Sequence, residues 1–507
     1  MQWTHRRFAG LSGILAAALA LGLGELLAGL FGPVPSPLNA IGGVVVDLSP
    51  GAVERWATSF FGTSDKVALA IGTAVIALIL GWFVGIASLR RFWVGVVVLA
   101  GFGAAGLAAG WGEHETRVIP LVAATLVAVA AGLLLLWLLL RAIDDSGAVL
   151  PDDATDGDSD RRRFLALAGV GGVVALGSGA IGRALLARVP PPPATDLAGV
   201  SAIALGPEHD FMIPGVVPLV VPAEEFYRID TALAIPRIDP ENWSIRVHGK
   251  VDREVTITYE DLTAADLIER YVTLACVSNR VGGTLVGNAL WTGIPLAGVL
   301  EQAGADRAGT QVVGRSIDGW TCGFPIDAAF DGRDAMIAVG MNGDVLPRRS
   351  GFPARLVVPG LYGYVSATKW LTEIEITGWD DFDPYWIPRG WAKEAPIKTQ
   401  SRIDVPRSGG SVEGPEVVAA GVAWAPHRGI AAVEVSLDDG PWQQAEVSVP
   451  LSDDAWVQWR VAVTAAPGSH HLEVRATDGD GVVQTDVVQA PAPDGATGHH
   501  RVDFTTT

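Results

Sequence analysis

One cysteine, placed at the start of a polar loop, is the residue of this sequence best suited to chemistry. Cys276 directly follows the apolar residues Leu274 and Ala275, and it is followed by Asn279 and Arg280. A thiolate at a strand edge can bind a soft metal, and a neighbouring arginine can bind an anion. A free cysteine is more often a small buried apolar residue, so the surrounding motifs must decide between these two interpretations.

The second cysteine, Cys322, is predicted to be a packing residue within the segment 319–324. A disulfide between Cys276 and Cys322 would require that Cys276 is not a metal ligand, because one thiolate cannot do both. Two cysteines exclude a disulfide framework, a four-cysteine zinc site and a protein-bound iron–sulfur cluster. The sequence also lacks the Cys-x-x-Cys-His motif of covalent haem attachment.

Four further motifs follow Cys276 in a fixed order. They are Trp-Thr-Gly-Ile-Pro-Leu at 291–296, Met-Asn-Gly-Asp-Val-Leu-Pro at 341–347, Gly-Phe-Pro-Ala-Arg-Leu-Val-Val-Pro-Gly at 351–360 and Lys-Trp-Leu at 369–371. In this order and at these spacings the set resembles the sulfite oxidase family of molybdopterin enzymes. The resemblance covers most of residues 220–505. It implies a Mo-molybdopterin cofactor with Cys276 as the molybdenum ligand.

The resemblance also implies which residues surround the cofactor. A pterin with a phosphate tail needs hydrogen bonds and either cations or backbone amides. Tyr227 and Arg228 are similar to the segment that approaches the pterin, and Arg280 aligns with the first arginine after the family's cysteine motif. Cys276, Arg228 and Arg280 are thereby expected to be catalytic. The other cofactor-binding residues implied are Ser316, Ser350, Arg355, Ser366, Ala367, Thr368 and Lys369. For each polar residue in this set, the alternative is an ordinary surface position.

The sequence departs from the family on the substrate side. Vertebrate sulfite oxidases have Asn-His after the arginine, and this chain has Ile229 and Asp230. Val281 and Val339 stand where sulfite oxidases place an arginine and a tyrosine. A pocket without that cation and that phenol should bind a small dianion less tightly. A sulfoxide or another less charged oxo-substrate is at least as well suited as sulfite, and an extracytoplasmic methionine sulfoxide reductase belongs to the same superfamily.

The N-terminal part has the pattern of a membrane region. Five apolar runs of spanning length cover residues 8–31, 67–89, 92–110, 118–140 and about 164–186. Basic residues cluster at alternating ends of these runs, at Arg6 and Arg7, Arg90 and Arg91, Arg141, and Arg161, Arg162 and Arg163. The positive-inside rule places all four clusters in the cytoplasm and everything after about residue 190 outside. The alternative is that the runs are buried helices of a soluble protein.

Composition and pattern together predict four segments of a multi-domain chain. We expect an all-α transmembrane region over 1–189, a Pro-rich linker over 190–210, an α+β sulfite-oxidase-type molybdopterin-binding domain over 211–395 and an all-β immunoglobulin-like sandwich over 396–507. The last segment resembles the family's dimerisation-type domain, which allows a homodimer. The expected strands are 243–249, 255–258, 417–424, 432–437, 459–464, 471–477 and 482–488, and a helix is expected at 261–262 with 264–269.

Two features precede the fifth apolar run. Residues 160–165 resemble a twin-arginine export signal inside the chain, although these arginines could also serve only to anchor the topology. The acidic stretch 152–160 is predicted to be a solvated cytoplasmic linker.

Charge and histidine placement limit the partners. A formal net charge of −19 argues against nucleic acid. The chain has no cytochrome b5-like segment, and none of its nine histidines is predicted to lie within a span, so the helices should carry no bis-histidine haem. We therefore expect a separate electron-transfer partner, either a cytochrome or a quinone-linked protein. The pairs His470-His471 and His499-His500 could bind a surface metal, but exposed pairs of this kind are usually inert.

These observations favour a multi-pass cell-membrane oxidoreductase with an extracytoplasmic catalytic domain. Its reaction would be oxygen-atom transfer on a small oxo-substrate, sulfite oxidase-like or sulfoxide reductase-like. The alternative is a non-catalytic membrane receptor or assembly module built on the same fold, and metal content separates the two. A transporter is disfavoured because Glu25 is the one intramembrane charged residue that stands out, and it lies near a helix end.

Overall fold

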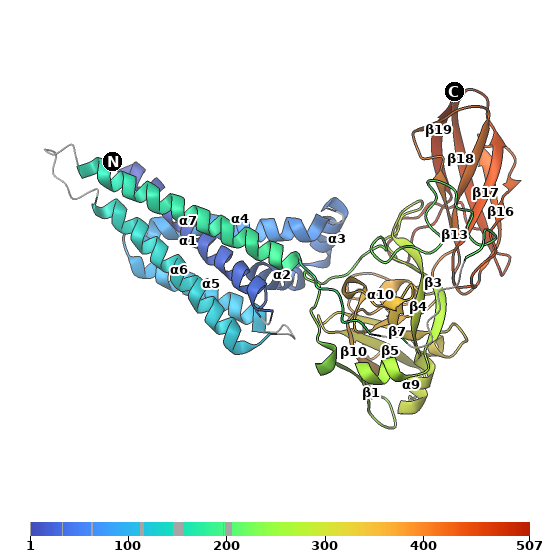
Figure 1. Cartoon of the computed structure of the whole chain (residues 1–507), viewed down its shortest axis with the longest axis horizontal. Helices are drawn as coiled ribbons and strands as arrows, with labels where there is room; N and C mark the ends of the chain where they lie inside the picture. The colour runs from blue at the N-terminus through green and yellow to red at the C-terminus, as the bar shows by residue number, and fades with distance from the viewer. Residues whose placement is uncertain are drawn as a thin grey trace. The chain divides into compact units, whose positions relative to one another are not determined.

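The computed structural model describes residues 2–32, 34–61, 64–111, 116–145, 156–195, 197 and 205–507. The chain forms two compact units, Met1–Pro190 with Ala232–Arg237, and Pro191–Thr231 with Ile238–Thr507. The long helices lie in the first unit and the β-sheets in the second (Figure 1).

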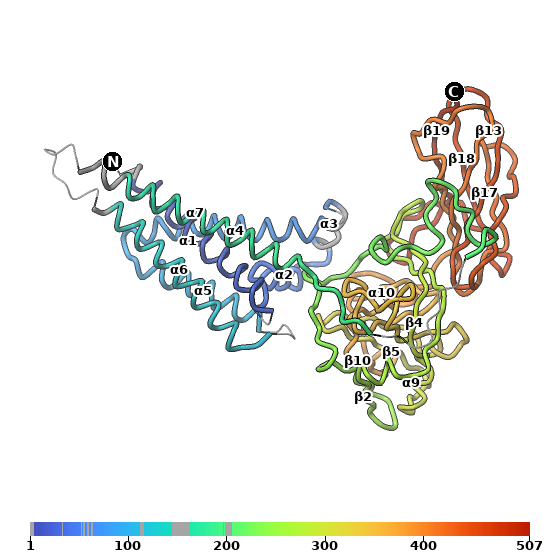
Figure 2. Tube along the Cα trace, in the orientation of Figure 1, coloured from blue at the N-terminus to red at the C-terminus, as the bar shows by residue number. Residues whose placement is uncertain are grey.

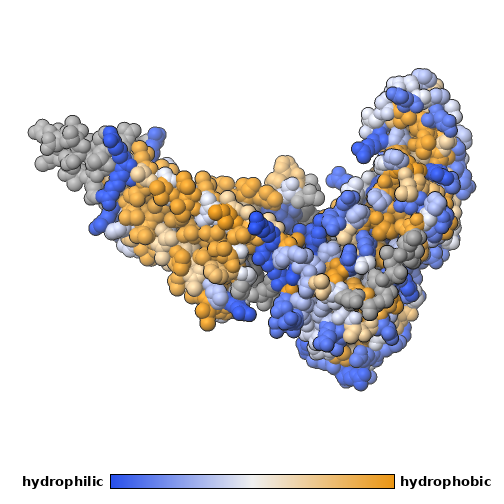
Figure 3. Space-filling model, viewed as in Figure 1, coloured by the Kyte–Doolittle hydropathy of each residue, from blue (hydrophilic) through white to orange (hydrophobic). Residues whose placement is uncertain are grey.

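Five helices of the first unit are long and apolar enough to cross a membrane, as the sequence predicts. They are α1 (Gln2–Leu30), α4 (Asp65–Ser88), α5 (Phe92–Trp111), α6 (Val118–Asp145) and α7 (Asp156–Ala187). The surface of this unit is largely apolar (Figure 3). Two shorter helices that the sequence analysis did not predict, α2 (Pro37–Leu48) and α3 (Gly51–Phe61), join α1 to α4.

Small residues let α1 pack closely against its neighbours α4, α6 and α7 (Figure 1). A Cβ atom added at Gly13 would lie 1.9 Å from the carbonyl oxygen of Gly81, and one at Gly85 would lie 2.0 Å from that of Ala9. These contacts make α1 antiparallel to α4. A Cβ at Gly182 would lie 2.4 Å from the backbone of Glu25. In a membrane, where apolar burial drives little helix association, such close backbone approach supplies the packing energy.

The helix directions bring the basic clusters to one end of the bundle. The rings of Phe8 and Phe164, at the starts of α1 and α7, lie 5.0 Å apart in an edge-on contact. A Cβ at Gly95, near the start of α5, would lie 2.9 Å from Leu136, near the end of α6. Hydrophilic side chains gather at the end of this unit where the N-terminus lies (Figure 3). The shared end is what the positive-inside argument requires, although no membrane side follows from it.

Two expectations about charged and histidine residues in the spans were wrong. His5 opens the first candidate span, so one histidine does lie within a span, although a single histidine cannot form a bis-histidine site. Arg183 lies in the fifth candidate span and pairs with Glu25 at 3.4 Å.

Glu25 is only 2% exposed, and its carboxylate accepts hydrogen bonds from Ser36 Oγ at 2.6 Å and the Leu38 N–H at 3.2 Å. This carboxylate ties α1, α2 and α7 together.

The segments that flank the fifth span lie only partly in the described residues. Residues 156–160 of the acidic stretch belong to the first turns of α7, so that part is helical, and the rest of the stretch lies outside the described residues. The twin-arginine-like residues 160–165 lie within the same helix.

The second unit begins with two sheets that position the candidate site. One sheet has the strand order β2 (Val255–Thr258), β1 (Ser244–Gly249), β10 (Leu371–Gly378), β5 (Thr310–Ser316) and β6 (Thr321–Pro325). The other has the order β3 (Ile268–Ala275), β4 (Val286–Pro295), β7 (Met336–Met341) and β8 (Asp344–Val345), with β9 (Arg355–Val357) also paired to β7. The short helices α8 (Tyr259–Ala264), α9 (Leu296–Ala303) and α10 (Gly363–Ser366) connect them.

The predicted helix at 264–269 was wrong. Helix α8 is fixed at its start by a capping box between Thr258 and Asp261, and it ends at Ala264. Residues from Ile268 onward instead form β3, which pairs antiparallel with β4 along its whole length. Strand pairing thus overrides the local helix pattern, because the chain gains a buried ladder there.

Two further sheets follow toward the C-terminus. One contains β11 (Gln400–Val405), β13 (Glu416–Trp424), β17 (Val457–Thr464) and β16 (Glu446–Val447), and the other contains β12 (Gly410–Val412), β19 (His500–Thr506), β18 (Gly468–Asp478), β14 (Ile430–Leu437) and β15 (Gln443–Gln444). The traces of these strands run alongside one another (Figure 2). Residues of both sheets, among them Val417, Val435, Trp459, Leu472 and Phe504, share one apolar core.

The expected strand at 482–488 was also wrong. Val482, Val487 and Val488 are exposed, and the segment forms only an isolated bridge between Thr477 and Val483. Its one buried residue is Gln484, whose side chain accepts a hydrogen bond from Ser401 Oγ at 2.7 Å. A run of valines therefore forms a loop because its polar residue, rather than its apolar ones, is buried.

The contact between α1 and α4 gives a direct test of the bundle. The variant Gly85→Val should lower the unfolding free energy by about 1–3 kcal/mol, because its side chain would meet the backbone of Ala9 and Gly13. Gly72→Val in the same helix is the control, since a Cβ there would have no neighbour within 4 Å. Thermal unfolding of the full chain in detergent measures both, and equal stability of the two variants would contradict this packing.

Candidate functional site

Cys276 is held at the end of β3 by a hydrogen-bonded loop. Its N–H donates to the carbonyl of Leu285 at 2.9 Å, and its carbonyl accepts from the N–H of Asn279 at 3.0 Å. The side chain of Asn279 then accepts from the N–H of Leu285 at 2.9 Å, which closes the loop. The thiol is half-buried and therefore fixed in place at the strand end, as the sequence predicts for this position.

Tyr227 and Lys369 lie near this thiol, and Arg355 lies near both of them. Burial raises the pKa of Tyr227, and the nearby thiol of Cys276 raises it further, while Arg355 opposes both. Burial also raises the pKa of the Cys276 thiol, against which hydrogen bonds from Ser278 and the charge of Lys369 act. Tyr227, Arg355 and Lys369 come from three separate segments, so the tertiary fold brings them to Cys276.

Arg355 is a buried cation held by carbonyl groups. It is 4% exposed, and it donates to the carbonyls of Ser350 at 3.1 Å and Leu356 at 3.3 Å. Its guanidinium lies 4.8 Å from the ring centroid of Trp291. Burial lowers the pKa of Arg355 to about 10. Carbonyl dipoles and an aromatic face orient the guanidinium but do not neutralise its charge, which suits an anionic ligand.

Lys369 lies next to Arg355 because a glycine separates their backbones. Gly351 has φ +119°, and a Cβ there would lie 3.1 Å both from Arg355 Cβ and from Lys369 Cα. Burial lowers the pKa of Lys369 to about 8, Asp230 opposes this effect, and Arg355 adds to it. Lys369 donates to the carboxylate of Asp230 at 3.1 Å and to the carbonyl of Ile229 at 3.1 Å.

Arg228 joins this group through the same carboxylate. Its Nε donates to Asp230 Oδ2 at 2.7 Å, and its Nη2 donates to Oδ1 at 3.2 Å. The structure thus brings five residues, Tyr227, Arg228, Cys276, Arg355 and Lys369, into one cluster. Asp230, which the sequence analysis noted only as a departure from the family, is the carboxylate within it.

The other residues implied by the resemblance take supporting positions. Ser350 provides the carbonyl that holds Arg355, and Ser366 is buried and donates to the carbonyl of Tyr362 at 3.1 Å. The hydroxyl of Thr368 points to Cys322, with 2.9 Å between its Oγ1 and Sγ. Ala367, which lies between Ser366 and Thr368, is half-buried. Ser316 ends β5 and pairs with Leu371, two residues beyond Lys369.

Cys322 is a packing residue, as predicted. It is fully buried in β6, and neither cysteine forms a disulfide. Burial raises the pKa of its thiol to about 11, and the hydrogen bond from Thr368 opposes that effect. This thiol therefore stays protonated in β6, where it supports the position of Thr368.

Three residues assigned to the substrate side do not join the cluster. Arg280 is exposed in the loop after Cys276. Val339 is fully buried in β7, where its carbonyl accepts from the N–H of Leu346 at 2.9 Å. Val281 is half-buried in the same loop as Arg280.

Tyr362 is a residue of the site that sequence reasoning missed. Burial raises its pKa to about 12, and the Cys276 thiol contributes to the increase. Its position at the start of α10, between two motifs that were recognised, is the signal that could have identified it. Its phenol oxygen accepts from the N–H of Lys398 at 3.5 Å, which links the site to the segment before β11.

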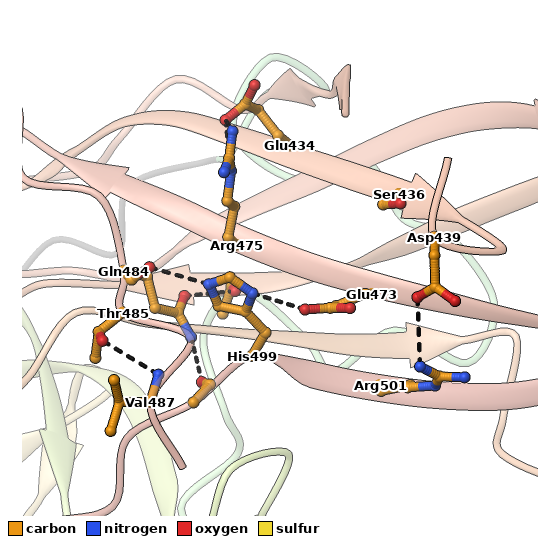
Figure 4. Close-up of polar contacts among 12 residues, drawn as sticks. Glu434, Ser436, Asp439, Glu473, Arg475, Gln484, Thr485, Val487, His499 and Arg501 are labelled. Carbon is orange, nitrogen blue, oxygen red and sulfur yellow. Dashed lines mark hydrogen bonds and ion pairs between the residues drawn. The ribbon is translucent and has the colours of Figure 1, made fainter. Parts of the chain in front are cut away.

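The histidine pairs of the C-terminal sheets are engaged by their own neighbours. The ring nitrogens of His499 lie 2.7 Å from Glu473 Oε1 and 3.0 Å from the carbonyl of Gln484 (Figure 4). Those of His470 lie 2.7 Å from Asp438 Oδ2 and 2.6 Å from the carbonyl of Ala466. Among the described residues no group of three or more His, Cys, Asp and Glu side chains could hold a metal ion.

The cluster fits a molybdenum–pterin group. A single thiol offers one soft ligand, and metal binding would deprotonate it despite its raised pKa. The buried Arg355 and the largely buried Lys369 fit a phosphate tail, because both are cationic donors in a site from which water is largely excluded. The thiol and the two cations therefore match the group in chemistry.

Comparisons with known proteins agree with this fit. Residues 232–386 match the family model described as the oxidoreductase molybdopterin binding domain. Human mitochondrial sulfite oxidase is 30% identical over 305 residues, which cover 50% of this chain and 56% of that protein. An uncharacterized oxidoreductase of Bacillus subtilis, YuiH, is 31% identical over 153 residues, covering 30% of this chain and 74% of that protein. The chain thus spans only about half the length of the sulfite oxidases that it matches.

Among solved structures, the sulfane dehydrogenase SoxCD of Paracoccus pantotrophus is similar, with a TM-score of 0.48 and 23% identity over 60% of this chain and 84% of that chain. The family model and the relative covered over most of its length are what decide the assignment. The chain therefore belongs to the molybdopterin-binding oxidoreductase family that includes the sulfite oxidases, and it is an oxidoreductase that depends on a molybdenum cofactor.

Proposed function

We propose that this protein is a membrane-anchored oxidoreductase that transfers an oxygen atom to or from a small oxo-substrate of low charge. The observation that carries the proposal is the cluster of one thiol, Cys276, with the buried cation Arg355 and the largely buried Lys369. Arg355 is surrounded by carbonyls and an indole, and burying such a cation costs free energy unless an anionic ligand repays it.

In this proposal Cys276 is the protein ligand of the metal, and Arg355, Lys369 and the backbone of residues 366–368 hold the anionic tail. When bound, the molybdenum–pterin group supplies a two-electron couple suited to oxygen-atom transfer. The phenol of Tyr227, whose pKa is raised by burial, stays protonated and can donate a hydrogen bond beside the thiolate. Ser316 and Ser350 complete the polar lining, and Arg228 approaches from the substrate side, whereas Arg280 is exposed in the loop after Cys276.

A sulfoxide is the substrate that the charges favour. Its reduction consumes two electrons and two protons and releases one water molecule and the sulfide. Asp230 takes up donors of both Arg228 and Lys369, and Arg280 is exposed, so few cations remain for a dianion. Val281 adds none. A neutral sulfoxide needs only one or two donors to its single oxygen, which this arrangement can supply.

The electrons must be exchanged with another protein. His5 is the only histidine of the five candidate spans, so these helices cannot hold a haem between two histidines. A separate cytochrome or quinone-linked protein is the partner that this arrangement requires.

The membrane anchor in this proposal is residues 1–189, followed by a Pro-rich linker over 190–210, a catalytic domain over 211–395 and an immunoglobulin-like sandwich over 396–507. The common basic end of the helices supports a multi-pass cell-membrane protein whose catalytic domain is extracytoplasmic. Residues 160–165 would then act as an internal twin-arginine signal. The two C-terminal sheets with one shared core support the sandwich, and its outer surface would serve a homodimer.

Metal content tests the ligand. Purified protein should contain one molybdenum per chain, Cys276→Ala should lose it, and Cys322→Ala should keep most of it. The difference follows because Cys322 is buried behind Thr368 rather than in the cluster. Elemental analysis of the three proteins measures their molybdenum content. Equal molybdenum in wild type and Cys276→Ala would refute Cys276 as the metal ligand and favour a non-catalytic module.

Protease accessibility tests the topology. Residues 211–507 should be cleaved by protease added to intact spheroplasts and protected in inverted vesicles, because the basic end of the bundle should stay in the cytoplasm. A cytoplasmic marker protein controls for lysis. The opposite pattern of protection would reverse the orientation.

A substrate screen tests the charge preference. Sulfite oxidation should be weak or absent, and a neutral sulfoxide with a reduced dye should be turned over. Each lost charge-assisted hydrogen bond is worth about 1.5–3 kcal/mol, or roughly 10- to 150-fold in affinity. Steady-state kinetics with an artificial acceptor measure the first reaction. Efficient sulfite turnover with half-saturation in the micromolar range would show that other residues rebuild the anion pocket.

A further inference from the structure

Asp230 sits between two cations of the site. Its side chain is 7% exposed, whereas those of Lys369 and Arg228 are 13% and 31% exposed. Oδ2 accepts from Arg228 Nε at 2.7 Å and from Lys369 Nζ at 3.1 Å, and Oδ1 accepts from Arg228 Nη2 at 3.2 Å. A side-on, two-point pairing of this kind is how a guanidinium binds an oxyanion. The carboxylate therefore occupies the donors that a free oxyanion would use.

The charge balance of the cluster depends on this carboxylate. Arg228, Arg355 and Lys369 carry three positive charges and Asp230 carries one negative charge, so these four side chains sum to +2. Asp318, whose pKa is raised by burial and by Asp230, is a further carboxyl nearby. We propose that Asp230 is a specificity-determining residue, a built-in anion that occupies the corner between Arg228 and Lys369 and keeps free oxyanions out of it. This inference rests on the proposed function, because it concerns the charge of the substrates that the proposed active site accepts.

The local structure makes Asp230 well suited to this role. Lys369 also donates to the carbonyl of Ile229, so the lysine is bound to the same two-residue segment as the carboxylate. The side chain of Arg228 is partly exposed, so a ligand from solvent can reach its remaining donors. Asparagine has nearly the same size as aspartate, and Asp230→Asn would raise the cluster charge from +2 to +3 without opening a cavity.

Sulfate binding to the full-length holoenzyme in detergent tests the inference. Calorimetric titration at pH 6.5 and low salt should show that Asp230→Asn binds sulfate at least about tenfold more tightly than wild type, because Arg228 loses its internal partner and the negative charge beside Lys369 is removed. At this pH Lys369, whose pKa is about 8, carries its charge in the wild type. Molybdenum content should stay at the wild-type level. The double variant Asp230→Asn/Arg228→Gln should lose the gain.

Asp331→Asn is the matched control. Arg333 Nε lies 2.9 Å and 3.0 Å from the two carboxylate oxygens of Asp331, another arginine–aspartate pair two residues apart, and it has no contact with the cluster among the described residues. This variant should bind sulfate as wild type does. A general loss of stability, in contrast, would affect both variants without tightening sulfate binding in either.

The outcomes separate this inference from the proposed function. Unchanged or weaker sulfate binding in Asp230→Asn would overturn the inference, and so would loss of molybdenum, which would make Asp230 a residue that holds the cofactor. Asp230→Ser, measured in the same way, replaces Asp230→Asn if the latter does not fold. Because calorimetry needs no turnover, inactivity toward every sulfoxide would overturn the proposed function alone.

Discussion

The indole of Trp291 is the contact on which the rest of the site depends. It is fully buried in β4, and its Nε1 donates to the carbonyl of Val272 in β3 at 3.2 Å. One face carries the guanidinium of Arg355, and Phe226 packs edge-on at 5.7 Å between ring centroids. Phe226 in turn stacks on Tyr227. A single aromatic side chain therefore fixes the strand that ends at Cys276, a buried cation and the segment that carries Tyr227 and Arg228.

The C-terminal sheets support the same strand from its other side. The N–H of Trp456 donates to Thr273 Oγ1 at 2.7 Å, and the N–H of Thr273 donates to the carbonyl of Asp454 at 2.9 Å. Arg402 donates to the carbonyl of Gly283, in the loop after Cys276, at 2.9 Å. Trp424 and Trp456 belong to the core that also contains Trp291. The sheets at the C-terminus are thus part of what holds the thiol in place, which explains why they form one compact unit with the two sheets around the candidate site.

The helical unit is stabilised by different interactions from those of the β-sheet unit. Its helices have apolar surfaces, so their contacts depend on close backbone approach at glycines such as Gly13 and Gly85, and on the polar group around Glu25. Residues Ala232–Arg237 belong to this unit, although in sequence they lie between the two segments of the other unit, Pro191–Thr231 and Ile238–Thr507. Arg237 donates to the carbonyl groups of Leu185 and Arg188 at the end of α7, which satisfies carbonyls that a helix end leaves unpaired.

The sequence by itself determined the apolar spans, the cysteine and six of the strands, because each depends on local pattern. Apolar runs long enough to span a membrane are recognisable from composition alone, and Cys276 is recognisable from the motifs that follow it. The strands at β2, β13 and β17 follow from alternating or continuous apolar residues. Where pairing competed with local preference, as at 264–269 and 482–488, the pattern misled, because long-range contacts decided which residues are buried.

Only the tertiary structure decided how the charges of the site are arranged. Arg228, Arg355 and Lys369 are far apart in sequence, and nothing local indicates that Arg228 and Lys369 share the carboxylate of Asp230 while Arg355 faces carbonyls and an indole. The sequence likewise could not place Tyr362 beside Cys276 or turn Thr368 toward Cys322. The physical reason is that the strength of an electrostatic interaction depends on the burial and the partners of the charged group. Both are set by segments that meet only when the sheets have formed.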